Sequence, residues 1–499
     1  MSVLVHVGQC GNQVGDAFWS LVADATTTLP AHAATTDNAG SGRPPRTGKG
    51  GALTVFHRFY FHPTSHMARC VLVDSEPKVI RAIIHSEDKA GRQAFKPAHA
   101  HYEQSGRGNN WAMGYNFQRF QLNVLPSSAA KPFAGMDDDR MELIDLVMES
   151  LRKEIEAVDV YEGAVVTHSL GGGTGAGLGC RVIERMRDSY PKTYVVTTSV
   201  APSMACGDTP LQNYNAVFTL ACLQEHVDCV VLKDNDDLLR TALQWKNNAK
   251  EGDSPTEASS SRVSLQDLNY LVASDLAGLL FPRKSGGRVE RCWIGDLVHD
   301  LCPLRTAKFI DVRTGINVKR QAISMKHGGK HKGVRLRSSI PVNPADMDNS
   351  TDQLVKLGRR TFQSFPRILV GSGGHLGCRF VTRYDAAVLK DVDEGRLTDA
   401  IGYLGAPPVP WTDNPIRRVE TATSAAPFET HGGIAAMTVA MNNGHGVSCI
   451  RHFRERAQRQ FQAKAYTHWY HQYGIEDDKF QEAFEQCANV IADYEDLLR

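Results

Sequence analysis

The 499-residue sequence predicts an α/β protein built on a doubly wound, mostly parallel sheet, with a second α/β domain and surface helices at the C-terminal end. Three observations lead to this prediction. Apolar runs of strand length recur along the first half of the chain, helical windows follow several of them, and a glycine-rich stretch stands where one run ends. In such a fold we expect the ligand beyond the carboxyl ends of the strands.

The strand candidates are continuous apolar runs, which suits strands buried on both faces of a parallel sheet. They are residues 2–7 (SVLVHV), 69–74 (RCVLVD), 163–168 (GAVVTH), 194–200 (YVVTTSV) and 228–234 (DCVVLKD). Helical periodicity follows in residues 142–158 and 179–190. It returns in the last fifty residues, where charged positions face outward and predict two consecutive helices on the outside of the fold.

Composition and charge narrow the class of protein. Hydrophobic residues make up 42% and charged residues 22%, as in ordinary soluble proteins, and the net charge of +1 predicts no nucleic-acid partner. No apolar run approaches the ~18 residues that span a bilayer, so we expect no membrane partner. The N-terminus lacks the basic start of a signal peptide, and the eleven cysteines form no CxxC pair. A cytosolic protein with reduced thiols is expected.

Three polar segments stand apart from this pattern. Residues 25–51 and 246–262 are low-complexity, cannot bury enough apolar surface to offset their ordering entropy, and are expected to be insertions in surface loops. Residues 318–339 are strongly basic. That segment predicts either a contact with an acidic partner or a solvated loop.

The stretch THSLGGGTGAGLGC, residues 167–180, raises the question of function. Glycines let backbone N–H groups converge on an anion, and a following helix N-terminus adds positive dipole character, so residues 171–177 are a candidate phosphate cradle. A flexible turn is the plain alternative. The absence of a following lysine excludes a P-loop, and only a loose GxGxxA match supports a dinucleotide fingerprint.

Further motifs resemble the tubulin superfamily. GGGTGAG (171–177) is similar to the tubulin signature GGGTGSG, with Ala176 replacing serine. Other segments resemble tubulin motifs and occur along the chain in the same order as in tubulins. They are VGQCGNQVG (7–15), VLVDSEP (71–77), QSGRGNNWAMGY (104–115), QNYNA (212–216), KDND (233–236), QDLN (266–269) and AKAYTHWY (463–470). The resemblance runs from residue 1 to 499 apart from the insertions. EPKVI (76–80), IGDLVHDLCP (294–303) and GIEDDKF (474–480) look most like the delta branch, with the zeta and epsilon branches as near alternatives.

The resemblance implies GTP or GDP and Mg²⁺ as cofactors. The GTP-binding residues would be Gly8, Gln9, Cys10, Gln13, Gly108, Asn109, Ser169, Gly171, Gly172, Gly173, Thr174, Gly175, Asp208, Asn235 and Asn269. Cys10 and Gln13 would lie near the sugar and base, Asp208 would bind ribose, and the amides of Asn235 and Asn269 would read the guanine edge. Asp74 and Glu76 would hold Mg²⁺, partly through water.

Several positions depart from the tubulin pattern. Leu265 stands where tubulins stack an aromatic ring on the base, Gln212 replaces a glutamate, and Arg107 replaces a small residue. Arg107 could contact a phosphate or point outward. Losing the ring would lower nucleotide affinity by ~1 kcal/mol or more. Arg291 and Trp293 occupy the usual Asn-x-Asp pair.

The resemblance also implies assembly. Tubulins associate longitudinally, head to tail, and complete the hydrolytic site in trans, where Asp296 matches the catalytic glutamate; the alternative is a surface aspartate. Expected partners are other tubulins or microtubule ends, in the cytoplasm and cytoskeleton, with a role in centrioles, basal bodies or flagella. A soluble NAD-dependent enzyme is the distant alternative.

The implied domain division has four parts. A nucleotide-binding domain would span residues 1–263, a core connecting helix 264–282, an intermediate α/β domain 283–430, and a C-terminal domain with two surface helices 431–499.

Overall fold

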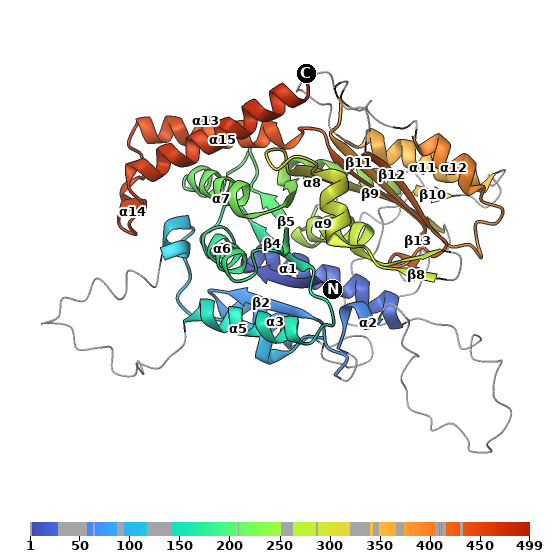
Figure 1. Cartoon of the computed structure of the whole chain (residues 1–499), viewed down its shortest axis with the longest axis horizontal. Coiled ribbons are helices and arrows are strands. Elements are labelled where there is room, and N and C mark those ends of the chain that lie inside the picture. Colours follow the sequence, from blue (N-terminus) through green and yellow to red (C-terminus); the bar gives the residue numbers. More distant parts are fainter. Residues whose placement is uncertain are drawn as a thin grey trace, which may run out of the picture.

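The structure is a computed structural model with an α/β fold, in which most strands lie in one continuous sheet (Figure 1). It describes residues 2–27, 57–62, 65–86, 94–116, 142–207, 209–250, 263–285, 288–319, 340–342, 349–365, 374–402, 404, 409, 411, 416–429 and 433–499.

Six parallel strands form the N-terminal half of the sheet, in the order β6-β5-β4-β1-β2-β3. They are β1 (Ser2–Val7), β2 (Cys70–Asp74), β3 (Ala100–Tyr102), β4 (Gly163–Ser169), β5 (Tyr194–Ala201) and β6 (Cys229–Asp234). The five strands predicted from apolar runs are confirmed, with ends that shift by a residue at most. β3 was not predicted, because three residues carry too little pattern.

Helices cover both faces of these strands. They are α1 (Gly8–Thr27), α2 (His57–Tyr60), α3 (Pro77–Ile84), α5 (Leu143–Glu156), α6 (Gly179–Ser189), α7 (Gln212–His226) and α8 (Asn235–Lys250), with a 3-10 turn at Pro97–His99. Alternate residues of β1 enter different cores: Val5 packs with Val217 of α7, and Leu4 packs with Phe18 of α1. The doubly wound α/β prediction is therefore confirmed.

A second group of strands continues the sheet. β9 (Phe309–Lys319) meets β6 through only two residue pairs, and β13 (Gly433–Asn442) lies antiparallel between β9 and β11 (Gly377–Tyr384). β12 (Ile416–Ala422) and β10 (Ile340–Val342) complete the group, while β7 (Arg283–Ser285) and β8 (Arg288–Glu290) form a separate hairpin. α10 (Ile294–Leu301), α11 (Ser350–Gln363) and α12 (Glu394–Gly402) accompany these strands.

The helix α9 (Leu265–Leu280) connects the two groups of strands. Ser264 and Asp267 close its N-terminus in a capping box, and most of its length is buried. A buried ion pair fastens it to the first group, since Lys233 Nζ of β6 donates to Asp275 Oδ2 at 2.7 Å. β13 lies beyond residue 431 yet in the centre of the second group of strands. The four-part domain division remains a prediction.

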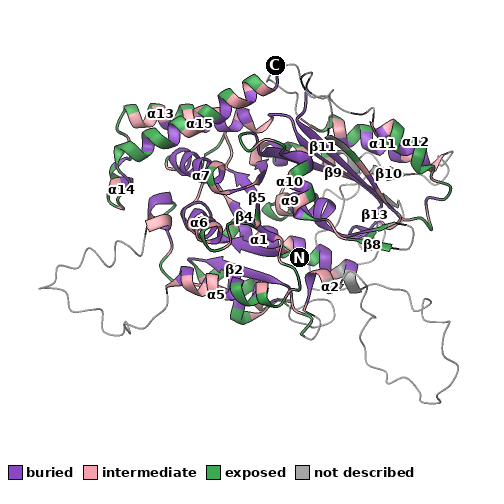
Figure 2. Cartoon of the chain, in the orientation of Figure 1, coloured by how far each residue is buried: buried purple, intermediate pink, exposed green. Residues whose placement is uncertain are grey.

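The C-terminal helices lie on the outside of α7, as predicted (Figure 1). α13 (Gly446–Gln462) and α15 (Asp477–Leu497) pack against each other and against α7, and a short helix, α14 (His468–His471), stands between them. Figure 2 shows their outer faces exposed and their inner faces buried. In the part of the chain that the structure describes, no helix is long and apolar enough to cross a membrane.

Two predicted boundaries were wrong by a few residues. α1 continues to Thr27 and α8 to Lys250, so the segments 25–51 and 246–262 begin as helix rather than loop. A helix whose preceding turns are packed can continue for a few residues into a polar segment, and composition alone did not show this. The remainder of both segments lies outside the described residues. The basic segment 318–339 also lies outside them, apart from the end of β9.

Candidate functional site

The candidate site lies at the carboxyl ends of β1 and β4, where the strand order reverses. β2 and β3 follow β1 on one side, whereas β4, β5 and β6 extend on the other. Adjacent loops leave the sheet in opposite directions at such a point and open a crevice for a ligand. The turn into α1 begins at Gly8, directly after β1, and the glycine-rich stretch begins directly after β4.

Close backbone packing joins the loops after β1 and β4. Gly8 has φ +74°, a conformation that favours glycine, and a Cβ on it would lie 2.8 Å from the amide nitrogen of Gly175. One turn later, a Cβ on Gly11 would lie 2.2 Å from the carbonyl oxygen of Thr167. Glycine is required at these positions because the two loops touch through their main chains.

The third loop, residues 106–110, closes the site from the side of β3. A Cβ on Gly173 would lie 2.3 Å from the carbonyl oxygen of Arg107. Gly108 and Asn109 both have positive φ, of +53° and +50°, and both are exposed. The structure thus brings the predicted residues of all three loops together at one end of the sheet.

The glycine-rich stretch itself forms a short π-helix, Gly173–Leu178, that runs into α6. π-helical turns are rare and are frequent at functional sites. His168 supports the turn from below, with Nδ1 3.0 Å from the carbonyl oxygen of Gly175 and Nε2 2.8 Å from Ser199 Oγ. Burial lowers the pKa of His168 to about 4, so the imidazole is neutral at physiological pH. Ser169 Oγ lies against Gly175.

Asn12 and Thr174 connect these loops to the end of β2. Asn12 Nδ2 donates to the carbonyl oxygens of Gly8 at 2.8 Å and Val73 at 2.9 Å, and its Oδ1 is a buried acceptor without a protein partner within hydrogen-bonding distance. The hydroxyls of Ser75 and Thr174 are 2.5 Å apart. The acidic turn after β2 therefore adjoins the glycine-rich stretch.

The two predicted Mg²⁺ residues differ in exposure. Asp74 is buried, and its Oδ1 accepts from the amide of Ser75 at 2.8 Å. Burial raises its pKa to about 6. Glu76 is exposed, and its carboxylate faces Gly106, where a Cβ would lie 3.1 Å from Glu76 Oε1. Among the described residues no cluster of three histidine, cysteine or carboxylate side chains is arranged to hold a metal. Two carboxylates fit Mg²⁺ only when phosphate and water supply the remaining ligands.

The base-reading residues predicted at the far end of the crevice are partly brought together. Asn269 of α9 and Gln13 of α1 approach each other, with Asn269 Nδ2 3.5 Å from Gln13 Oε1. Asn235 is the first residue of α8 and is half-buried. Cys10 packs in a small apolar cluster with Val14, and burial raises its thiol pKa to about 12. Cys10 is therefore a protonated thiol within this cluster.

Leu265 leaves an apolar side chain uncovered. It is the first residue of α9, four positions before Asn269, and is 67% exposed. Gln9, in the first turn of α1, is also exposed. Asp208 lies outside the described residues. Gln212 is buried, and its Nε2 lies 3.4 Å from the carbonyl oxygen of Ser203.

Arg107 takes neither of the two orientations that the sequence left open. Its side chain is buried and turns back along its own loop, where Nη2 donates to Glu103 Oε2 at 2.5 Å and Nη1 to Ser105 Oγ at 2.8 Å. The guanidinium thus stiffens the loop from behind. The positive charge is neutralised by Glu103 rather than directed at a ligand.

Asn215 is a site residue for which the sequence predicted no role. It is fully buried in the first turn of α7, and its Nδ2 donates to the carbonyl oxygens of Asn109 at 2.7 Å and Gly171 at 2.8 Å. It therefore joins two of the three loops. The motif QNYNA marked the region, but an asparagine within a helical window carries no signal of its long-range partners.

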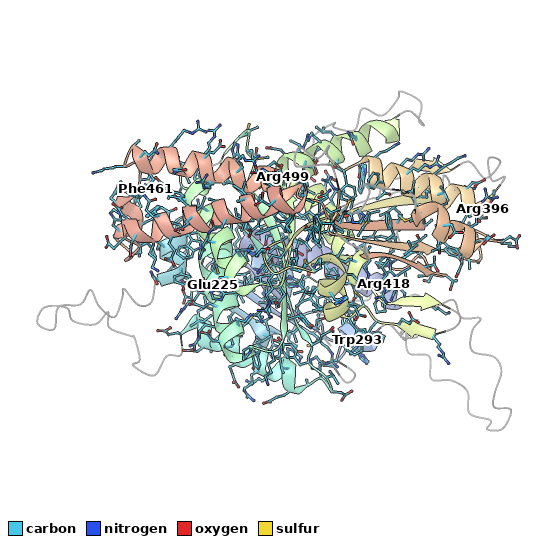
Figure 3. The ribbon with its side chains drawn as sticks, turned by 45° about the horizontal axis from the view of Figure 1, so that its top comes forward. Glu225, Trp293, Arg396, Arg418, Phe461 and Arg499 are labelled. Carbon is cyan, nitrogen blue, oxygen red and sulfur yellow. The ribbon has the colours of Figure 1, made fainter. Side chains whose placement is uncertain are left out.

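Asp296 lies near the amino-terminal end of β4, whereas the glycine-rich stretch follows the carboxyl end of the same strand. It is exposed on α10, next to Gly295, whose amide donates to Glu162 Oε1 at 2.8 Å just before β4 begins. Arg291 and Trp293 precede α10, and the guanidinium stacks 3.1 Å from the centre of the indole ring. Trp293 lies at the surface (Figure 3). Asp296 therefore belongs to a different face of the molecule from the cradle residues.

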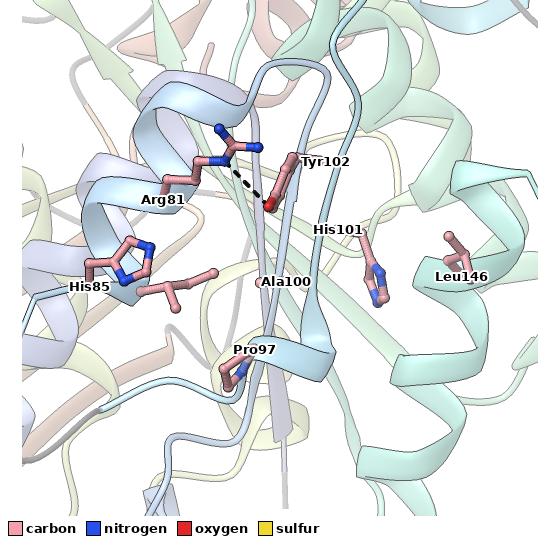
Figure 4. Close-up of a pocket in the computed structure, with 8 residues that line it drawn as sticks. Arg81, His85, Pro97, Ala100, His101, Tyr102 and Leu146 are labelled. Carbon is pink, nitrogen blue, oxygen red and sulfur yellow. Dashed lines mark hydrogen bonds between the residues drawn. The ribbon is translucent and has the colours of Figure 1, made fainter.

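A separate cavity of about 470 Å³ lies at the β3 end of the sheet, between α3 and α5 (Figure 4). Arg81, His101 and Tyr102 line it, and none of them belongs to the loops just described. Arg81 is held by the Tyr102 hydroxyl at 3.4 Å. The cavity is distinct from the candidate site.

Comparison with known proteins points to one family. Residues 2–242 match the Tubulin/FtsZ family, GTPase domain. Over 500 residues the chain is 26% identical to the tubulin beta-1 chain of Chondrus crispus, covering 99% of this chain and 93% of that protein. It is also 26% identical to the tubulin beta chain of Trichophyton rubrum over 503 residues, covering 99% and 95%. The matched GTPase domain contains all three loops of the candidate site.

Proposed function

Because residues 2–242 match the GTPase domain of the Tubulin/FtsZ family, we propose that the chain binds GTP or GDP at the three loops and acts as an assembly component of microtubules. The observation that supports nucleotide binding most strongly is the main-chain contact of Gly8 with Gly175 and of Gly173 with Arg107. Three loops from distant parts of the sequence converge at the strand-order reversal. Glycines at such a position would let backbone N–H groups converge on phosphate oxygens.

Each part of the nucleotide has candidate contacts. The phosphates would rest on Gly171, Gly172, Gly173, Thr174 and Gly175, with Gly8, Gln9, Gly108, Asn109 and Ser169 around them. Gln13 and Asn269 would face the base together with Asn235, since an amide offers the donor and acceptor that distinguish guanine from adenine. Asp208 is proposed for the ribose, and Cys10 for the wall beside it.

The acidic turn after β2 is the proposed position for magnesium. Glu76 would hold the ion through water at the open side, and the buried Asp74 would orient that water from beneath, so that the cation would offset the negative charge of the carboxylates and the phosphates. The ion would neutralise the charge on the phosphate oxygens. Within the protein, the amides of Ser75 and Glu76 already hold Asp74 Oδ1 in place.

Hydrolysis would require a second subunit. Asp296 lies near the amino-terminal end of β4, and the loops of the candidate site lie at the carboxyl ends of the strands. A single chain therefore cannot bring the two together. A head-to-tail contact with another tubulin would place Asp296 against the neighbour's nucleotide, where its carboxylate could orient the attacking water. This arrangement predicts that Asp296→Asn retains nucleotide binding but loses any hydrolysis that assembly stimulates.

We further propose a role in centrioles, basal bodies or flagella, as part of the cytoskeleton. This part of the proposal rests on sequence likeness to the delta branch in EPKVI and IGDLVHDLCP, and a zeta- or epsilon-type tubulin is the alternative. Localisation of a tagged chain tests it. Signal along all cytoplasmic microtubules, with none at centrioles, would contradict it.

Nucleotide content is the first test of the proposed site. The chain is purified, denatured, and the released nucleotides are separated by chromatography. Near-stoichiometric GTP or GDP is expected. If the chain is instead purified empty, titration with GTP, ATP and NAD decides the matter, and preference for NAD or equal affinity for ATP would refute the proposal.

A further inference from the structure

Asn215 uses its whole side chain to connect the two nucleotide loops to the C-terminal layer. Its Nδ2 holds the carbonyl oxygens of Asn109 and Gly171, as described above. Its Oδ1 accepts from the amide of Trp111 at 2.8 Å and from the hydroxyl of Tyr470 at 2.6 Å. An amide that donates twice and accepts twice has a single orientation, and Tyr470 is the partner that comes from the far end of the sequence.

Tyr470 is itself held firmly. It is fully buried in α14, and its ring lies 5.7 Å from that of Phe218 and 5.4 Å from that of Tyr214. Its hydroxyl is also 3.3 Å from the carbonyl oxygen of Leu211, at the start of α7. The ring packing fixes the hydroxyl where it can orient Asn215.

Two further bonds join the same parts of the molecule. Asn110 Nδ2 donates to the carbonyl oxygen of Trp469 at 2.9 Å, directly beside the exposed Asn109. Asn116 Nδ2 donates to the carbonyl oxygen of Tyr473 at 2.9 Å. The end of the loop that contacts the glycine-rich stretch, and the helical turn that follows it, are therefore each bonded to the segment 468–473.

We infer that Asn215 and Tyr470 form a positioning relay, through which residues 468–473 set the affinity of the nucleotide site. The inference rests on the proposed guanine-nucleotide function. Neither side chain has to contact the nucleotide, because Asn215 holds the carbonyl groups of Asn109 and Gly171 and thereby fixes the main chain of both loops. By linkage, the effect is reciprocal: nucleotide binding stabilises residues 468–473, and any partner that displaces them weakens nucleotide binding by the same factor.

A pair of matched variants tests the relay. Tyr470→Phe removes the hydroxyl that orients Asn215. Tyr214→Phe removes one hydroxyl from the same aromatic cluster, where it donates to the carbonyl oxygen of Ala465 at 3.0 Å and does not contact Asn215. GTP affinity is measured by calorimetry on chains stripped of nucleotide, and thermal unfolding is recorded without nucleotide. Tyr470→Phe is expected to weaken GTP binding about five- to tenfold, and Tyr214→Phe less than about twofold.

The outcomes separate the relay from the proposed function. If the unaltered chain binds GTP and the two variants bind it equally well, the relay is refuted while the nucleotide site stands. If the unaltered chain binds no guanine nucleotide, both proposals are refuted. Equal losses of affinity in both variants would assign the effect to general loosening of the aromatic cluster and would also refute the relay.

Hydrogen exchange on the unaltered chain gives a second readout that does not depend on a variant folding. Saturation with GTP is expected to slow exchange at the amides of Tyr470 and His471, which donate to the carbonyl oxygen of Thr467 at 2.8 Å and 3.0 Å. Protection confined to the glycine-rich stretch, with unchanged exchange across 468–473, would contradict the relay.

Discussion

The contact between Gly8 and Gly175 makes the sharpest prediction about the site. Gly8→Ala places a methyl group 2.8 Å from the amide nitrogen and 3.0 Å from the Cα of Gly175, where both obstacles are backbone atoms. It also forces an L-residue to φ +74°. The conformation alone costs about 1–3 kcal/mol, offset by up to about 1 kcal/mol from the stiffer unfolded chain.

Together these two effects give a net loss of stability between about 0 and 3 kcal/mol, and displacement of the glycine-rich stretch adds to it. Because that displacement moves the amides expected to hold phosphate, GTP affinity should fall by about tenfold or more. Gly402→Ala is the matched control, since its new Cβ meets no atom within 4 Å. Urea unfolding measures the stability and calorimetry the affinity. A variant that loses stability but keeps full GTP affinity would refute the reasoning that this contact shapes the cradle.

Three further predictions concern individual side chains. Leu265→Tyr should tighten GTP binding by about fivefold, because an aromatic ring at this exposed position can stack on the base and a leucine side chain cannot. Unchanged GTP affinity in calorimetry would show that Leu265 does not belong to the site. The raised pKa of Asp74, about 6, means that the folded chain retains a proton that the unfolded chain releases near its ordinary value of 3.8. The contribution of Asp74 therefore lowers the stability of the nucleotide-free chain as pH rises from about 4 to 6. Mg²⁺ should also stabilise the GTP complex less below pH 6. Asp74→Asn should abolish both trends in thermal unfolding. Glu154 is buried between His62, Lys96 and His99, and its pKa is lowered to about 2 although burial opposes the shift. The contribution of Glu154 to stability is present above pH 4.5 and lost toward pH 2. Glu154→Gln should destabilise the fold by about 3 kcal/mol at pH 7. An unchanged midpoint of urea unfolding would contradict this prediction.

Much of the fold follows from local pattern. The five apolar runs became β1, β2, β4, β5 and β6 because strands covered on both faces favour apolar residues on both faces. The C-terminal helices follow in the same way from their one-sided burial. Short elements such as β3 and α14 did not appear in advance, since three or four residues are stabilised by their neighbours rather than by their own sequence.

The candidate site divides along the same line. The glycines of residues 171–177 indicated a phosphate cradle, because freedom of the main chain is a local property of the sequence. The orientation of Arg107 was not predictable: whether its guanidinium turns to a ligand or to Glu103 depends on which carboxylate the folded loop brings within reach. The same applies to Asp74, whose raised pKa results from burial under neighbouring loops.

The sequence by itself determined three features: the alternation of strands and helices in the N-terminal half, the glycine-rich turn, and the helices at the end of the chain. Each depends on residues close to one another in the sequence. Only the tertiary structure decided that Asn215 would join the loops at 109 and 171 to Tyr470. It also decided that Asp296 would lie near the amino-terminal end of β4, away from the loops at the carboxyl ends of the strands. The physical reason is that hydrogen bonds between residues as much as 359 positions apart are selected by the packing of helices and strands, and their partners leave no periodic mark in the sequence.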